Sequence, residues 1–152
     1  ESVAALGMAR VLLTQAGLSD LAALVLGYQR ELFVVGAELA TNPERRDRLV
    51  DGTTRVSEAM LSAVETELAA REAQITMPRE FVVPGETEAS AALEVARTVL
   101  RRAERRVVGL QRDGAIASEW LVPYLNRLAD LLWVLARAAE QAEHAPTTRM
   151  RA

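Results

Sequence analysis

The segment Ala96-Arg-Thr-Val-Leu-Arg-Arg-Ala-Glu-Arg-Arg106 combines dense positive charge with an unbroken apolar stripe. Apolar residues in and around it recur at the a and d positions of a heptad: Leu93, Ala96, Leu100, Ala103, Val107 and Leu110. This repeat predicts a long helix from about Thr87 to Arg112, which Asp113-Gly114 ends. Such a stripe has to be covered by other helices.

The arginines of this helix lie on two separate faces. At about 100° per residue, Arg97, Arg101 and Glu104 fall within roughly 60° of each other on the flank of the stripe, where a neighbouring helix should cover them. Arg102 and Arg106 share another stripe, which points to subunit contacts or solvent. A solvated face with pairs such as Arg101 and Glu104 is one interpretation. Because buried like charges are costly, an anionic ligand such as a nucleotide triphosphate is the other.

Four further segments have helical periodicity, and turn signals separate them. The predicted helices run from Ser2 to Ala16, from a cap at Ser19 or Asp20 to Ala40, from a cap at Thr53 or Thr54 to Ala73, and from Val122 to Glu143. The second should be deeply buried, because its inner face is apolar throughout. An extended linker, 75–86, holds the apolar run Phe81-Val-Val83. We therefore predict an all-α, single-domain fold, a ferritin-like antiparallel bundle of five helices over 1–143, with a disordered tail at 144–152.

Composition excludes several classes of function. The net charge of −3 argues against general nucleic-acid binding, and the 18 basic residues are all arginine. Cysteine is absent and His144 is the single histidine, which excludes thiolate chemistry, a histidine-based triad and a multi-histidine metal site, so no metal-ligating residues are predicted. No apolar run approaches the roughly 20 residues of a membrane span, and no signal peptide is visible, so a cytoplasmic protein is expected.

The last predicted helix presents a mixed polar face. Asn126, Asp130, Trp133 and Arg137 share one side of it. An amide, a carboxylate and an indole on one side can hydrogen-bond to and stack on a ligand. Alternatively, Asp130 pairs with an arginine of the neighbouring helix, and the spacing favours neither.

Three runs together resemble PduO-type ATP:cob(I)alamin adenosyltransferases. They are Phe81-Val-Val-Pro-Gly85, Ala96-Arg-Thr-Val-Leu-Arg-Arg-Ala-Glu-Arg105 and Tyr124-Leu-Asn-Arg-Leu-Ala-Asp-Leu-Leu-Trp133. The corresponding family patterns are close to F-[VI]-L-P-G-G, A-R-x-x-x-R-R-A-E-R and Y-L-N-R-L-S-D-x-L-F. Their order and separations also match, and the similarity spans nearly the whole chain.

This resemblance implies a homotrimer with active sites between subunits, which transfers the adenosyl group of ATP to the cobalt of reduced cobalamin and releases triphosphate. It implies that Arg97, Arg101, Glu104 and Asn126 bind ATP, with the two arginines catalytic and Mg²⁺ on the phosphates. A flavoprotein reductase and an adenosylcobalamin-dependent enzyme are the implied partners.

The resemblance also gives the apolar linker a purpose. Phe81 would press on the lower face of the corrin and keep cobalt free of its lower ligand, which eases reduction to the Co(I) nucleophile. Trp133, in place of the family's usual phenylalanine, would line the corrin pocket. The simpler interpretation is that Phe81 anchors the linker on the core.

The chain also departs from the family pattern. The family's glycine-rich phosphate loop, which normally precedes the first helix, is not in this sequence, and we expect it to be a disordered segment upstream of Glu1. Val3 stands at an expected asparagine and Glu86 at an expected glycine. An alternative function is therefore a non-catalytic cobalamin-binding or trafficking homologue that has lost ATP chemistry. A helical regulatory or scaffold module is a third.

Overall fold

Apolar residues at helical spacing form five α-helices in the computed structural model, which describes residues 1–116 and 118–150. The helices are α1 (Ser2–Gln15), α2 (Ser19–Ala40), α3 (Glu58–Glu72), α4 (Glu88–Arg112) and α5 (Leu121–Ala142), and the 3₁₀-helix η1 (Pro43–Arg48) lies between α2 and α3. Within these described residues the only strand-like pairs are two isolated bridges. The predicted all-α fold is confirmed.

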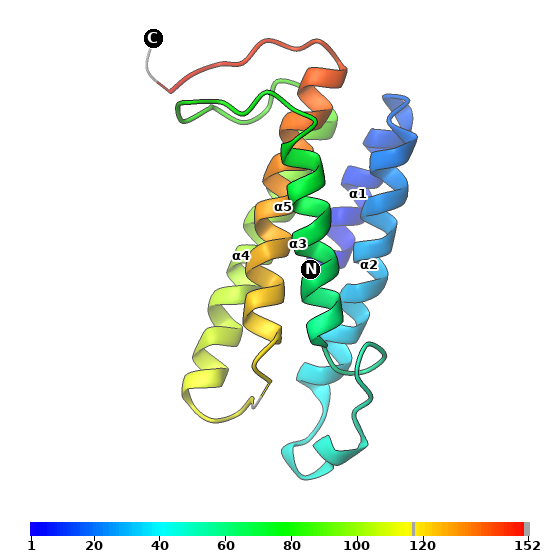
Figure 1. Ribbon diagram of the computed structural model, residues 1–152, viewed down its shortest axis with the longest axis vertical. Coiled ribbons are helices and arrows are strands. Elements are labelled where there is room, and N and C mark those ends of the chain that lie inside the picture. Colours follow the sequence, from blue (N-terminus) through cyan, green and yellow to red (C-terminus); the bar gives the residue numbers. More distant parts are fainter. Residues whose placement is uncertain (117, 151–152) are drawn as a thin grey trace.

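Consecutive helices run in opposite directions along the long axis of the molecule (Figure 1). α5 packs against α4 and α3, while α1 packs between α4 and α2. α5 supplies more of the buried core than any other helix, and most of its apolar residues from Leu121 to Ala139 are buried. The interface between α4 and α5 is therefore a rigid platform for any side chains that project from it.

The start of α4 agrees with the sequence prediction, whereas the start of α3 does not. A reciprocal capping box between Thr87 and Ser90 fixes the first turn of α4. α3 is capped by Ser57, whose Oγ accepts from the Met60 amide at 3.3 Å, so the predicted cap at Thr53 or Thr54 is wrong. The reason is tertiary: Val56 is fully buried, and its amide donates to Glu38 Oε2 at 2.8 Å, which keeps the preceding residues in a turn.

α2 is less buried than its sequence predicts. It lies at one edge of the bundle and packs mainly on α1, which leaves Phe33 69% exposed on its outer side. Its first residue is Ser19, preceded by Leu18 without a side-chain cap, so the predicted polar cap is also wrong. The apolar stripe of α4 likewise ends early, because Leu110 is exposed in the last turn.

The linker after α3 pairs with the C-terminal segment. The Val83 amide donates to the Thr148 carbonyl at 2.8 Å, and the Met150 amide donates to the Phe81 carbonyl at 2.9 Å. The two segments run side by side beyond the same end of the bundle (Figure 1). Disorder of the tail 144–152 stays a prediction, but in the structure its part up to Met150 lies along the linker, and its last two residues are outside the described chain.

None of the described helices combines the length and the apolar character that a bilayer crossing requires.

Candidate functional site

A cleft of about 540 Å³ opens between the linker and the α4–α5 pair. Three residues that the sequence assigns to a site line it together: Phe81, Arg97 and Trp133. The linker positions Phe81, α4 positions Arg97 and α5 positions Trp133. An aromatic wall beside a guanidinium suits a large planar ligand that carries, or lies next to, an anion.

Phe81 does not anchor the linker on the core, since its side chain is 80% exposed. The simpler interpretation of this residue is therefore wrong. Its backbone is nevertheless held in place, because the Phe81 carbonyl accepts from Met150 and the neighbouring Val83 amide donates to Thr148. An exposed aromatic ring on a fixed backbone has little to stabilise it in the free protein, which is typical of a ligand contact.

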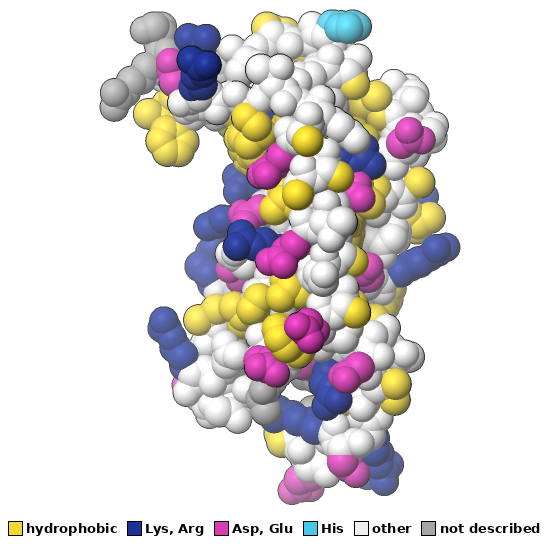
Figure 2. Space-filling view, viewed as in Figure 1, with side chains coloured by type: hydrophobic (Ala, Val, Ile, Leu, Met, Phe, Trp, Pro, Cys, Tyr) yellow, Lys and Arg dark blue, Asp and Glu magenta, His cyan; other side chains and the backbone are white. Residues whose placement is uncertain are grey.

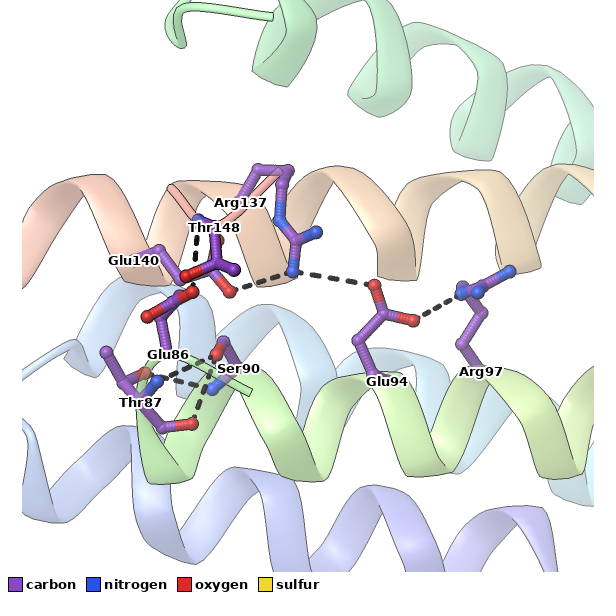
Figure 3. Close-up of polar contacts among 8 residues, drawn as sticks. All are labelled: Glu86, Thr87, Ser90, Glu94, Arg97, Arg137, Glu140 and Thr148. Carbon is purple, nitrogen blue, oxygen red and sulfur yellow. Dashed lines mark hydrogen bonds and ion pairs between the residues drawn. The ribbon is translucent and has the colours of Figure 1, made fainter. Parts of the chain in front are cut away.

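Arg97 is partly buried and oriented by an acid on its own helix. Its Nε donates to Glu94 Oε2 at 2.7 Å, and its side chain is 24% exposed (Figure 3). Because Glu94 occupies the Nε position, the two terminal amino groups of the guanidinium stay available to a ligand in the cleft.

Arg97, Arg101 and Glu104 lie along one side of α4, which we call the α4 face. Arg101 is exposed, and neither an ion pair nor a hydrogen bond of its side chain occurs among the described residues. The expectation that a neighbouring helix covers it is wrong within this chain, because α5 passes on the Glu104 side. There the Asn126 Nδ2 donates to Glu104 Oε1 at 2.9 Å. From Arg97 to Glu104 the face extends about 10 Å along the helix.

Asp130 pairs within its own helix, so its predicted pairing with an arginine of the neighbouring helix is wrong, while ligand binding by this face stays a prediction. Asp130 accepts from Arg127 of its own helix at 3.0 Å, and Arg127 also reaches Glu65 of α3 at 3.3 Å. Asp130 therefore belongs to a surface ion-pair group rather than to the cleft. Arg102 is exposed and pairs with Glu1, away from the cleft.

The structure contains a buried ionic cluster beside the cleft that the sequence did not predict. Arg137 is 2% exposed, and its Nη2 lies 2.8 Å from Glu140 Oε1 and 3.5 Å from Glu94 Oε1 (Figure 3). Its guanidinium carbon is 5.5 Å from the centroid of the Trp133 ring, within cation–π range. Burial raises the pKa of the Glu140 carboxyl, while Ser90 and Arg137 act in the opposite direction.

Local spacing held a partial signal for this cluster. Glu94 and Arg97 are three residues apart, as are Arg137 and Glu140, and both spacings favour contact on a helix. The contact between Glu94 and Arg137 joins two helices and has no signature in either one. Charges are otherwise interspersed on the face of the molecule drawn in Figure 2, without a broad field of one sign.

Metal coordination by protein side chains alone finds no support in the part of the chain that the structure describes, which contains no group of three or more His, Asp or Glu residues able to hold an ion. A metal that accompanies a nucleotide would have to be held largely by phosphate oxygens and water.

Comparison with known sequences matches residues 1–139 to the family model for cobalamin adenosyltransferase. The chain is 39% identical over 123 residues to a corrinoid adenosyltransferase of Bacillus subtilis, an alignment that covers 81% of this chain and 60% of the relative. It is 36% identical over 133 residues to a cobalamin adenosyltransferase of Cupriavidus metallidurans, which covers 87% and 67%. The chain thus spans about 60% of the length of the Bacillus relative.

Solved structures share the same fold. A variant of the PduO-type ATP:corrinoid adenosyltransferase from Lactobacillus reuteri, complexed with ATP, superposes with a TM-score of 0.83 at 27% identity and covers 99% of this chain and 82% of its own. Another variant of that enzyme, complexed with cobalamin and ATP, gives a TM-score of 0.76 at 28% identity, with coverage of 99% and 86%. From its family match and its fold, the chain belongs to the cobalamin adenosyltransferase family.

Proposed function

We propose that this chain forms the helical part of a corrinoid adenosyltransferase, which transfers the 5′-deoxyadenosyl group of ATP to the cobalt of cob(I)alamin and releases triphosphate. The observation that carries the proposal is the shared cleft of Arg97, Phe81 and Trp133. A phosphate-binding side chain and two aromatic side chains converge there from three separate elements. The relatives named above bear the same activity in their names, and the solved variants hold ATP, or cobalamin and ATP.

The α4 face supplies the electrostatics of the nucleotide half. As the Co(I) lone pair forms a bond to C5′ of ATP, the C5′–O bond breaks and its electron pair leaves on the triphosphate. Arg97 and Arg101 present permanent positive charge to that leaving group, and preorganised charge of this kind lowers the barrier. The pair of Glu104 and Asn126, with its fixed 2.9 Å hydrogen bond, would contact the nucleoside or ribose end.

The aromatic residues supply the corrinoid half. The exposed ring of Phe81 is free to press on one face of a corrin, and Trp133 would form the opposite wall of the cleft. A bulky apolar wedge disfavours the lower axial ligand, so cobalt is reduced more easily to the Co(I) nucleophile. Phe81 therefore acts on reduction, whereas Arg97 and Arg101 act on transfer.

A homotrimer with sites between subunits is part of the proposal. Its support is the open side of the α4 face, where Arg101 is exposed, and the exposed apolar side chains on the outer surfaces of α1 and α2, namely Val11 and Phe33. A second copy would cover that side and complete the phosphate site. Mg²⁺ would enter on the ATP phosphates, and a cytoplasmic flavoprotein reductase and an adenosylcobalamin-dependent enzyme would act before and after this one.

The test is to incubate the full-length protein with ATP and chemically reduced cobalamin under anaerobic conditions. The proposal predicts the absorption spectrum of adenosylcobalamin, with one triphosphate released for each corrinoid converted. Cobalamin binding without conversion would support the non-catalytic homologue instead. If the protein neither binds nor converts cobalamin, that result would refute the assignment of this cleft.

A further inference from the structure

We infer that Glu94 is a positioning residue, which holds Arg97 in its phosphate-binding orientation and ties it through Arg137 to the corrin-facing Trp133. The inference rests on the proposed function and assigns a role to residues that the family motifs leave aside. It concerns the part of α4 where the buried cluster meets the cleft.

Glu94 is shared between two arginines, and each of its oxygens has a different partner. Its Oε2 accepts from Arg97 Nε at 2.7 Å, and its Oε1 lies 3.5 Å from Arg137 Nη2 (Figure 3). Glu94 is itself only 6% exposed. A carboxylate held from both sides in the interior has one available orientation, so it can fix the direction of the arginine that it contacts.

In the guanidinium of Arg97, Nε is bonded to Glu94, and the two Nη groups remain available to a ligand. Fixing Nε orients the two Nη groups before a ligand arrives, and this reduces the rotamer entropy that binding would otherwise cost. Arg101 has no such support among the described residues. Glu94 therefore makes Arg97 the fixed member of the pair.

Arg137 extends this arrangement to the aromatic wall. One guanidinium contacts Glu94, Glu140 and the face of Trp133, at a carbon-to-centroid distance of 5.5 Å for the ring. Its Nε and Nη1 are buried and have no hydrogen-bond partner among the described residues. The phosphate-facing and corrin-facing halves of the cleft are thus linked by consecutive contacts from Arg97 to Trp133.

The chain contains a matched control for this inference. Glu140 is buried to a similar degree as Glu94, at 4% exposed, and pairs with the same Arg137. Glu140 accepts from Arg137, however, and makes no hydrogen bond or ion pair with Arg97 among the described residues. Removing the charge of Glu140 perturbs the cluster without releasing Arg97, whereas removing the charge of Glu94 does both.

The experiment compares Glu94→Gln with Glu140→Gln in the full-length protein. Titration calorimetry with inorganic tripolyphosphate measures phosphate affinity, and the KM for ATP is measured in the adenosylation assay. We expect Glu94→Gln to weaken tripolyphosphate binding and raise the KM about tenfold, and Glu140→Gln to leave both within about twofold. In an Arg97→Ala background, Glu94→Gln should have no further effect.

Equal losses in the two glutamine variants, or an undiminished additional loss in the Arg97→Ala background, would overturn the inference. Arg97→Lys leaves the buried cluster in place but lacks the Nε donor, so it should lose affinity to the same extent, and wild-type affinity in this variant would also overturn it. The inference would also be overturned if the wild-type protein did not bind tripolyphosphate. Binding without adenosylation would instead refute the proposed function, while the affinity comparison still decides the role of Glu94.

Discussion

Replacing Arg137 with methionine should be the most destabilising single change in the α4–α5 interface. The substitution leaves the carboxylates of Glu94 and Glu140 buried without their common positive partner. Loss of one member of a buried ion pair typically costs about 3–5 kcal/mol. For a chain of this size, an unfolding entropy of roughly 2 cal/mol/K per residue converts that cost to a fall in Tm of about 10–15 °C.

Thermal unfolding followed by far-ultraviolet circular dichroism measures this fall. A triple variant, Arg137→Met with Glu94→Gln and Glu140→Gln, is the matched control, because it removes the stranded charges together with the arginine. It should recover most of the lost stability. Burial raises the pKa of the Glu140 carboxyl, so the deficit of the single variant should also shrink as the pH falls and this carboxyl takes up a proton. A deficit below about 1 kcal/mol, or a triple variant as unstable as the single one, would contradict this prediction.

Three further predictions concern the site and the core. Arg101→Ala should lower the rate of ATP-dependent adenosylation by about 100-fold or more and leave the circular dichroism spectrum of the helices unchanged. The control Arg102→Ala should keep a near-normal rate. Near-normal turnover of Arg101→Ala would contradict the role of Arg101. Phe81 is 80% exposed, so Phe81→Ala should change the free energy of unfolding by less than about 0.5 kcal/mol. The variant should nevertheless slow the formation of Co(I) from Co(II) with a flavoprotein reductant, and an unchanged rate would contradict the role of Phe81. Burial raises the pKa of the Glu31 carboxyl, although the Tyr124 hydroxyl donates to it, so the folded state binds this proton more tightly than the unfolded state does. The free energy of unfolding should therefore decline as the pH rises from about 4.3 through the raised pKa. Glu31→Gln should flatten this slope in urea titrations at several pH values, and an unaltered slope would contradict the assignment.

The helices were predictable because each one carries its own apolar stripe. The heptad positions from Leu93 to Val107 are nearly all buried, and the turn at Asp113-Gly114 ends α4 as its sequence indicates. The start of α3 was not predictable, because Ser57 becomes the cap only after Val56 is buried against Glu38. Such a dependence on a distant partner leaves no local pattern.

The site divides in the same way. Motif spacing identified Arg97, Phe81 and Trp133, and the structure brings them to one cleft. Sequence reasoning missed Glu94, since its contact with Arg137 joins two helices, and it expected cover over Arg101 that one copy of the chain does not provide. Periodicity tells which face of a helix is polar, but not which polar side chain meets which.

In the proposed function, the α4 face binds the triphosphate of ATP while the adjoining cleft binds the corrin. The most direct measurement is a crystal structure of the full-length protein with ATP and cob(II)alamin. We expect phosphate oxygens at about 3 Å from the guanidinium nitrogens of Arg97 and Arg101, with the corrin in contact with Phe81 and Trp133. Phosphates bound away from these arginines, or a corrin outside the cleft, would contradict it.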